Sequence, residues 1–388
     1  MKALHIISSG GMYGAEAVVL NLARALRNGP HECVLGVFSN SSNPNVQLHE
    51  IALKDGFDSY LVPCSGQIDR AAVAGIRQLT IRTDADVVHA HGYKADIYVY
   101  LALRGLGVPL VSTCHTWYDT DWKASLYGRM DRFVLRKYTR VVAVSGEVEQ
   151  RLLKAGVRAE KVCVVHNGID LCPFNASLPS LRADAKEQGA LLVGLVGRLA
   201  WEKGVDLFLR AAARVLVEVP EARFVVVGEG PDREKLERLI DELRIRESAV
   251  LIGRRDDMAS VYASFDVMVS SSRQEGMPIA ILEGMASGLA LVATAVGEVP
   301  TAVVNGQTGV LVPSEDIGRM AAAIVQLLRD TQLRKQLGDA ARRSIEEQYS
   351  AARMTEDYLR VYEEAVAAAK RGHKARAGST AASQGGAR

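Results

Sequence analysis

Residues 271–288 read SSRQEGMPIAILEGMASG and lead from an apolar run into a short apolar helix. Pro278 suits the first turn of that helix, because its missing N–H would be unpaired there. The segment 279–286 is apolar on every side except at Glu283, so we expect the helix to be buried. A second carboxylate, Glu275, stands just before the helix begins. Because a buried carboxylate needs a partner, this strand–loop–helix unit predicts a binding site as well as a fold.

The same alternation of short apolar runs and amphipathic segments continues along the whole chain. Several runs are apolar throughout, which is typical of parallel strands that are covered on both faces. The pattern lapses in the connector 167–190, rich in Pro, Asn and Ser, and then restarts. We therefore predict an α/β protein with two Rossmann-like, doubly wound domains in tandem. The expected strands are 3–9, 33–39, 59–64, 86–91, 109–115, 140–145 and 161–168, then 191–199, 223–230, 249–254, 267–272, 289–294 and 309–313.

The predicted domains are 1–172 and 190–349, with a ligand site expected at the carboxyl ends of both sheets. A long helical region is expected over 314–370. The basic, Gly/Ala/Ser-rich segment 371–388 lacks the apolar residues of a packed element, so we expect a disordered tail.

Composition and charge exclude several classes of function. The 388 residues carry a formal net charge of only +2, which gives no indication of nucleic-acid binding. The five cysteines form no CxxC pair and are interpreted as reduced thiols of a cytosolic protein. The apolar stretch 277–296 contains Glu283 and two glycines, so a buried helix–turn–strand is favoured over a membrane span. We expect a cytoplasmic protein without a signal peptide.

The first glycine-rich turn, SSGGMYGAE, follows the first predicted strand and opens the first helix. Gly11 and Gly14 match the last two glycines of a dinucleotide fingerprint, but Ser9 replaces the first. The second strand also ends without the acidic residue that would hold a ribose, so NAD binding is disfavoured. The residues leave two interpretations open, an ordinary turn and a loop that approaches an anionic ligand.

Three histidines, His89, His91 and His115, end two neighbouring predicted strands. The sequence DTD at 119–121 resembles a metal-binding pattern, but no helical HxxxH pair completes a ligand set. We interpret the three as cleft histidines without a metal, with His115 the best candidate for contact with a substrate. The alternative for His89 is a structural histidine with satisfied hydrogen bonds.

The sequence GRLAWEKG places two cations just after the first strand of the second domain. Arg198 and Lys203 suit a diphosphate there, because Arg binds two oxygens and Lys acts as a point charge, and Gly197 allows close approach. The alternative is a solvated pair near Glu202. In the opening motif, Glu275 and the backbone N–H groups of 276–279 together suit a polyol.

Glu283 would escape the cost of burial by accepting hydrogen bonds from two vicinal hydroxyls, which a ribose supplies. Its alternative is a buried pair with an arginine, which leaves Glu275 unexplained.

These motifs together resemble the retaining glycosyltransferases of the GT-B fold, family four, over almost the whole chain to about residue 365. The glutamates of EGMPIAILEG resemble the EX7E motif. GGMYGAE, GRLAWEKG and VVVGEGPDREKLE before it, and SGLALVATAVGEVPTAVVNGQTGVLVP after it, resemble the family in the same order and spacing. The resemblance implies metal-independent transfer of a sugar from a nucleotide diphospho-sugar, a UDP-sugar above others, with no cofactor. It also implies that the final helix, about 350–370, packs back on the first domain.

Carried over by position, the resemblance assigns a role to each motif. Gly11 and Gly14 would lie near the donor phosphates and acceptor, and His115 near the reacting sugar. Arg198 and Lys203, beside Gly197, would neutralise the diphosphate leaving group. The family often has a bulky aromatic residue where this chain has Met277, which leaves the donor sugar open. The donor site implied by the resemblance comprises Glu275, Gly276, Met277, Pro278, Ile279 and Glu283.

The segment 123–140 carries six Lys and Arg residues and one acid. We expect an apolar stripe of Leu126, Tyr127, Met130, Phe133 and Val134 on it, and hypothesise contact with an anionic membrane surface. The alternative is a solvated basic face over a core stripe.

The resemblance places the expected acceptor, a glycan, glycolipid or lipid-linked sugar, in bacterial cell-surface polysaccharide synthesis. Rival functions are a sugar-nucleotide epimerase of the same fold and a non-catalytic nucleotide-sugar binding protein.

Overall fold

A computed structural model describes residues 1–9, 11–12, 14–27, 29–41, 45–65, 69–115, 122–175, 177–181 and 190–384 of the chain, with side chains except in 122–127 and 372–384. The chain forms two compact units. The first combines Met1–Gly168 with Ala351–Arg388, and the second is the continuous segment Ile169–Ser350.

The first unit is built on a parallel sheet in the order β3-β2-β1-β4-β5-β6-β7. The order reverses beside β1, which pairs with β2 on one side and with β4 on the other. All five residues of β4 are buried, as expected for a central strand covered on both faces. The strands are β1 (Lys2–Ile7), β2 (Glu32–Asn40), β3 (Asp58–Cys64), β4 (Val87–His91), β5 (Leu110–Cys114), β6 (Arg140–Ala143) and β7 (Val162–Val164).

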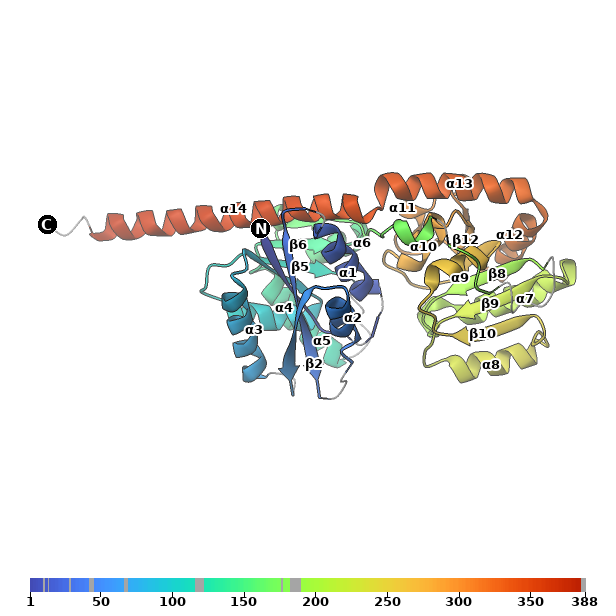
Figure 1. Cartoon of the computed structure of the whole chain (residues 1–388), viewed down its shortest axis with the longest axis horizontal. Coiled ribbons are helices and arrows are strands. Elements are labelled where there is room, and N and C mark those ends of the chain that lie inside the picture. The colour runs from blue at the N-terminus through green and yellow to red at the C-terminus, as the bar shows by residue number, and fades with distance from the viewer. Residues whose placement is uncertain are drawn as a thin grey trace. The chain divides into compact units, whose positions relative to one another are not determined.

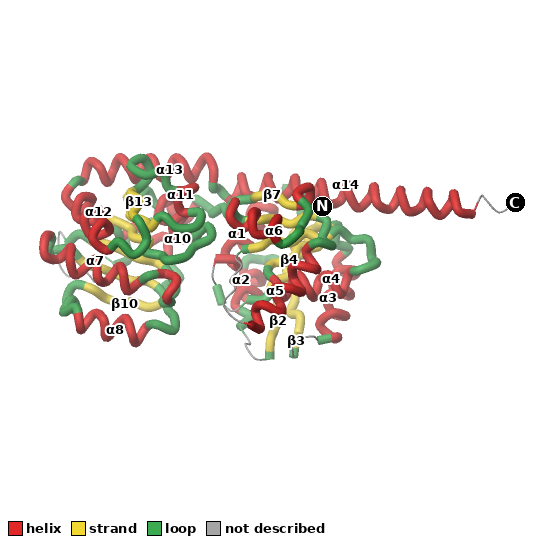
Figure 2. Tube along the Cα trace, turned by 180° about the vertical axis from the view of Figure 1, so that it is seen from behind, coloured by secondary structure: helices red, strands yellow, loops and turns green. Residues whose placement is uncertain are grey.

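Helices enclose this sheet, as the red segments around the yellow strands in Figure 2 show. Several begin at a side-chain cap: Asp69 accepts hydrogen bonds from two N–H groups of α3, and Ser145 accepts one from α6. The last helix, α14, packs against α1, β4 and β5 of this unit (Figure 1). The helices are α1 (Gly14–Leu26), α2 (Gln47–Lys54), α3 (Arg70–Thr83), α4 (Tyr93–Leu103), α5 (Trp122–Leu135), α6 (Gly146–Lys154), η1 (Ala159–Lys161) and α14 (Ala351–Gln384).

The second unit repeats this plan on a parallel sheet in the order β10-β9-β8-β11-β12-β13. Here the order reverses beside β8, which lies between β9 and β11. The strands are β8 (Leu192–Val196), β9 (Arg223–Val227), β10 (Ala249–Gly253), β11 (Val267–Ser270), β12 (Ala290–Thr294) and β13 (Val310–Val312). The helices are η2 (Cys172–Phe174), η3 (Trp201–Lys203), α7 (Val205–Glu218), α8 (Arg233–Glu242), α9 (Met258–Ser264), α10 (Ile279–Ala286), α11 (Val299–Ala302), α12 (Ile317–Arg329) and α13 (Thr331–Gln348).

These two sheets confirm the predicted α/β architecture with two Rossmann-like halves, and the strands appear where the apolar runs predicted them. The end of the chain differs from the expectation. The backbone of α14 continues as a helix to Gln384, through a segment for which we expected disorder from residue 371. Its many Ala, Arg and Lys residues have high helix propensity, which accounts for the continuation. Within the described residues, every helix is too short or too polar to span a bilayer.

Candidate functional site

The candidate donor site lies at the reversal of strand order in the second sheet. In an open α/β sheet the connections diverge at such a point and leave a crevice at the carboxyl ends of the strands. The strands beside the reversal are β8 and β11, and the motif GRLAWEKG follows the first while SSRQEGMP follows the second. The fold therefore brings together two motifs that are far apart in the sequence.

Lys203 and Glu275 connect the two motifs directly. The Lys203 Nζ lies 2.6 Å from Glu275 Oε1, and Ser272 Oγ donates a hydrogen bond to the same oxygen at 2.6 Å. The Glu275 side chain is 7% exposed and that of Lys203 is 27% exposed. A charge-assisted pair at this burial is held firmly, so the carboxylate has a fixed position at the strand ends.

Two glycines let the loops of the site approach closely. Gly204 adopts φ +60°, and a Cβ there would lie 2.1 Å from the carbonyl oxygen of Ser271. Gly297 adopts φ +51°, and a Cβ there would lie 1.8 Å from the carbonyl oxygen of Glu275. Both positions combine a left-handed backbone with a contact that excludes any side chain. The position of Glu275 thus depends on the close approach of neighbouring loops as well as on the loop that carries it.

Arg198 differs from Lys203 in that its charge is not compensated. Its side chain is exposed and makes no hydrogen bond or ion pair with any residue that the structure describes. Gly197, before it, hydrogen-bonds through its N–H to Val227 at the end of β9. Because Lys203 and Glu275 neutralise each other, Arg198 supplies the positive charge of this strand end.

The helix α10 begins beside Glu275. Pro278 is its N-cap residue and Ile279 its first residue, and no side chain caps its N-terminus. Met277 is buried in the apolar core, whereas Gly276 accepts a hydrogen bond from the N–H of Glu298. Unpaired N–H groups at a helix N-terminus favour an anion or a hydroxyl oxygen.

Glu283 has a partner that the sequence did not indicate. The hydroxyl of Tyr262, on α9, donates a hydrogen bond to Glu283 Oε2 at 2.8 Å. Burial raises the pKa of Glu283 to about 7, although the Tyr262 hydrogen bond acts in the opposite direction. The alternative of a buried pair with an arginine is wrong, because a neutral tyrosine fills that role. Tyr262 is itself fully buried and therefore reads as a core aromatic in the sequence.

A second group of residues, which the sequence did not indicate, supports the loop that carries Glu275. Arg273 forms a bidentate pair with Asp206, with N–O distances of 2.7 and 2.8 Å, and a further pair with Glu315 at 2.5 Å. The Arg273 guanidinium also lies 5.4 Å from the centre of the Trp201 ring. These contacts tie the loop after β11 to η3 and α7. Their only signal in the sequence is an arginine next to the motif, which is common on surfaces.

In the first unit, Gly11 and Gly14 lie after β1, and Gly14 begins α1. Ser9 Oγ hydrogen-bonds with both the N–H and the carbonyl of Gly11, which closes a tight turn at the carboxyl end of the strand. The turn thus lies beside the reversal of strand order in this sheet as well.

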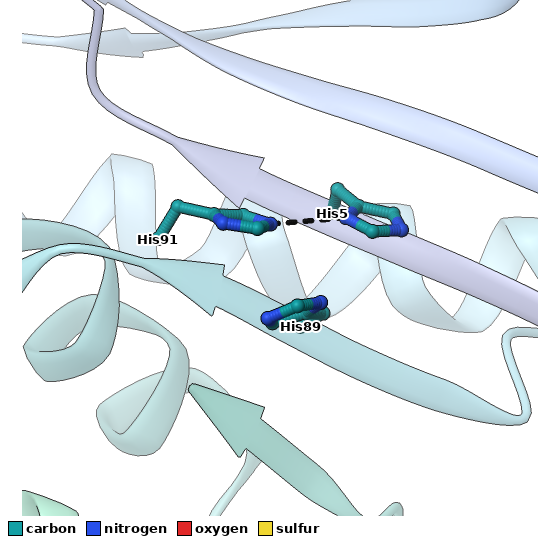
Figure 3. A group of neighbouring side chains, drawn as sticks. All are labelled: His5, His89 and His91. Atoms are coloured by element: carbon teal, nitrogen blue, oxygen red, sulfur yellow. Dashed lines mark hydrogen bonds between the residues drawn. The ribbon is translucent and has the colours of Figure 1, made fainter. Parts of the chain in front are cut away.

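Four histidines of the first unit, His5, His89, His91 and His115, lie close together, and all but His115 are buried. His91 Nε2 lies 3.0 Å from His5 Nδ1, and His91 Nδ1 lies 3.2 Å from His115 Nε2. Figure 3 shows His5 and His91 joined by the first of these contacts, with His89 beside them. Burial lowers the pKa of His5 and of His115 to about 4, so these rings are neutral at pH 7. His115 is the one of these histidines that is partly exposed, so a ligand can reach it.

His89 is a structural residue, and its placement in a cleft was wrong. It is fully buried, with Nδ1 2.7 Å from the hydroxyl of Tyr362 on α14 and Nε2 2.7 Å from Thr113 Oγ1. His91 is also buried, because α14 covers this face of the sheet. The resemblance implied that the final helix packs on the first domain, but the sequence did not show that it would cover the end of this strand.

Nitrogen atoms of His5, His89 and His91 lie within 4.8 Å of one another, a spacing that a metal ion could bridge. However, both ring nitrogens of His89 and of His91 already have hydrogen-bond partners, which a metal would have to displace. These hydrogen bonds account for His89 and His91, whereas His5 Nε2 is buried without a hydrogen-bond partner among the described residues. The DTD sequence at 119–121 lies outside the described residues.

The basic segment 123–140 is only partly as expected. Val134 is buried and Met130 packs against the core, so these two do not share an exposed stripe with Phe133. Phe133 is 56% exposed, and Lys137 Nζ lies 5.5 Å from the centre of its ring. The side chains of Leu126 and Tyr127 lie outside the described part of the structure. Among the described side chains of 128–140, the exposed ones are Phe133 and three basic residues, Arg129, Arg136 and Lys137.

Two family models match the chain. Residues 12–172 match the model of Glycosyltransferase Family 4, and residues 180–344 match that of Glycosyl transferases group 1. The alpha-D-kanosaminyltransferase of Streptomyces kanamyceticus is 31% identical over 299 residues, which cover 71% of this chain and 77% of that protein. The phosphatidyl-myo-inositol mannosyltransferase of Mycolicibacterium smegmatis is 29% identical over 363 residues, 90% of each chain.

Solved structures show the same fold. The crystal structure of Anabaena HepE in complex with UDP-glucose superposes with a TM-score of 0.83, covering 94% of this chain and 99% of that one at 22% identity. The two-sheet architecture described above is thus the GT-B arrangement of the glycosyltransferases.

Proposed function

Because the chain belongs to the glycosyltransferase family described by these two models, we propose that it transfers a hexose or an N-acetylhexosamine from a UDP-sugar to a glycan, glycolipid or lipid-linked acceptor. The anomeric configuration is retained, and neither a metal nor another cofactor takes part. The observation that carries this proposal is the 2.6 Å ion pair between Lys203 and Glu275, which joins the two motifs at the reversal of strand order.

Each residue of the site has a part in this proposal. Arg198 and Lys203 contact the diphosphate, beside the backbone of Gly197, and the N–H groups at the start of α10 face the same anion. Glu275 accepts hydrogen bonds from hydroxyls of the transferred sugar through the oxygen that Lys203 and Ser272 leave free. Glu283, oriented by Tyr262, accepts hydrogen bonds from the two ribose hydroxyls.

The reaction breaks the bond between the anomeric carbon and the β-phosphate oxygen. Negative charge then develops on the diphosphate, where the fixed cations and N–H groups stabilise it best. The acceptor hydroxyl attacks from the same face, forms the new glycosidic bond and gives its proton to the departing phosphate oxygen. In this scheme Glu275 forms no covalent intermediate: Lys203 and Ser272 engage its Oε1, and its other oxygen binds the sugar hydroxyls.

In the first unit, His115 and the turn at Gly11 and Gly14 contribute to the acceptor side. His115 is neutral at pH 7, so it acts as a hydrogen-bonding group for the reacting sugar rather than as a cation. The neighbouring rings His91 and His5 hold its orientation through their hydrogen bonds.

The setting that we propose is bacterial cell-surface polysaccharide or glycolipid synthesis at the inner face of a membrane. The mannosyltransferase relative is named for a phosphatidyl-myo-inositol substrate, which is a membrane lipid. The exposed side chains of Phe133, Arg129 and Lys137 supply an aromatic and two basic contacts for an anionic surface. Absence of binding to anionic vesicles at moderate salt would remove this part of the proposal.

The first test is calorimetric binding of UDP, GDP, ADP and NAD to the purified chain, each with and without EDTA. We expect tight binding of UDP, unchanged by EDTA and weakened in Arg198→Ala. Binding of NAD, or dependence on a metal, would contradict the proposal. Proton NMR of the first product formed from an α-linked UDP-sugar then tests retention. Donor consumed to an epimer without any acceptor would identify an epimerase instead.

A further inference from the structure

Lys94 is a half-buried cation with no carboxylate partner in the part of the chain that the structure describes. It lies in the first turn of α4, and its Nζ donates a hydrogen bond to Asn40 Oδ1 at the end of β2. The same Nζ lies 4.8 Å from the centre of the Phe38 ring and 5.8 Å from that of Tyr98. Within the described residues, Lys94 takes part in no ion pair. The ammonium is therefore held by an amide oxygen and two aromatic faces alone.

Local rules of stability do not explain this placement. A cation in the first turn of a helix faces the positive end of the helix dipole, which is unfavourable. Partial burial of an ammonium without a counter-ion adds a desolvation cost. The backbone N–H of Asp69 donates a hydrogen bond to the Tyr98 hydroxyl. The carboxylate of Asp69 accepts hydrogen bonds from Ser65, Ala71 and Ala72 rather than from Lys94. Departures of this kind are expected at functional sites.

The position of Lys94 in the sheet indicates a ligand. The strand order of the first sheet reverses between β1 and β4, and Lys94 follows β4 directly. Asn40 ends β2, the other neighbour of β1, and its Nδ2 lies 3.5 Å from Ser8 Oγ just after β1. Ser8, Asn40 and Lys94 thus line the carboxyl ends of three adjacent strands at a ligand-binding crevice of such folds. In the second sheet, Arg198 follows β8, the strand that corresponds to β1.

We propose that the acceptor of the transfer reaction carries a phosphate or carboxylate group and that Lys94 binds this group at the strand reversal of the first sheet. The inference rests on the proposed function and names the chemical class of its second substrate. An anionic oxygen completes the coordination of the ammonium, whose remaining N–H donors have no acceptor in the described residues. Ser8 and the amide of Asn40 supply neutral hydrogen bonds beside it.

The test uses the full chain with UDP bound first, so that the second sheet's anion site is filled. Inorganic phosphate is then added at constant ionic strength, and the 13Cε resonances of the lysines are followed by NMR. We expect saturable movement of the Lys94 signal, identified by its loss in Lys94→Met. In Lys54→Met, a control at an exposed lysine of the same unit, the movement should persist. Met keeps the packing against Phe38 and Tyr98, and thermal unfolding checks that the variant is folded.

The outcomes separate the two proposals. Wild-type protein that does not bind UDP contradicts the proposed function itself. Protein that binds UDP, but in which phosphate moves Lys94 no more than Lys54, overturns the inference alone. Retained UDP affinity in Lys94→Met with loss of the phosphate effect supports it.

Turnover then distinguishes the two sources of an anionic group. One arm offers soluble phosphate monoesters and dicarboxylates together with their neutral analogues, and the other offers vesicles that contain an acidic phospholipid. We expect Lys94→Met to raise the KM for the anionic acceptor at least about tenfold, the effect of losing one hydrogen bond to a charged group. Lys94→Arg should restore part of the loss. Equal use of neutral and anionic acceptors, unchanged in Lys94→Met, would overturn the inference.

Discussion

The pair of Tyr262 and Glu283 gives a quantitative prediction for donor binding. Burial raises the pKa of Glu283 to about 7, and the proposed ribose contact needs the ionised carboxylate as acceptor. At pH 6 only about a tenth of the carboxylate is ionised, and at pH 8 about nine tenths. Because the bound nucleotide favours the ionised form, its affinity should increase with pH through this range. We expect UDP to bind roughly tenfold more weakly at pH 6 than at pH 8 through this group.

Tyr262→Phe should move that transition upward. A hydrogen bond to a charged group contributes about 1.5–3 kcal/mol, and 1.36 kcal/mol corresponds to one pKa unit. Loss of the Tyr262 hydroxyl should therefore raise the pH midpoint of UDP binding by about one to two units. The measurement is calorimetric titration with UDP from pH 6 to 9 for wild type, Tyr262→Phe and Glu283→Gln. Dividing each affinity by that of Glu283→Gln removes the ionisation of UDP itself. A ratio that does not change with pH would refute the assignment of Glu283 to the ribose.

Three further predictions concern other parts of the chain. Arg198→Ala should weaken UDP binding by more than about tenfold, as expected for a lost charge-assisted contact, and leave the melting temperature unchanged because the side chain is exposed; Arg210→Ala, an exposed control, should change neither. Burial, and then the nearby Asp131 carboxyl, raise the pKa of Asp96 well above its usual range, so the folded chain keeps a proton that the unfolded chain loses as pH rises. Asp96→Asn should therefore stabilise the protein by about 1 kcal/mol or more in urea unfolding at pH 8, and by less at pH 4.5; an equal or opposite effect at the two pH values would contradict this reasoning. The lowered pKa values of His5 and His115 destabilise the fold at low pH, whereas the raised pKa of Asp96 destabilises it at high pH. For the histidines, the reason is that the unfolded chain takes up protons between pH 6.5 and 4 that the folded chain does not. As the pH is lowered from 6.5 to 4, the free energy of unfolding should therefore decrease. The NMR signals of these two rings should not titrate between pH 5.5 and 8.

The fold and the motif residues could be predicted from the sequence because both depend on local patterns. Continuous apolar runs predicted the parallel strands, and Pro278 with the apolar segment 279–286 predicted the helix that follows β11. The pairing of Lys203 with Glu275 follows from the strand order, which places β8 beside β11. It was not visible as a contact until that order was known.

The partners of these residues could not be predicted, because they come from distant segments that look ordinary in isolation. Tyr262 reads as a core aromatic, and Lys94 as one lysine among many. His89 was misplaced because its environment is set by Tyr362 on α14, 273 positions later in the chain. Contacts of this kind are specified by packing and leave no periodic signal in the sequence.

The contact between His89 and Tyr362 also bears on how the chain is made. The second unit is one continuous segment, whereas the first unit needs both ends of the chain. During synthesis residues 1–168 leave the ribosome with part of one face of their sheet uncovered, and the histidines beneath α14 remain open to water until that helix follows. The second unit, complete in itself, can fold while the first still waits for its covering helix. Loss of the residues from 351 onward would consequently affect the unit formed by residues 1–168, far away in the sequence, before the unit that immediately precedes them.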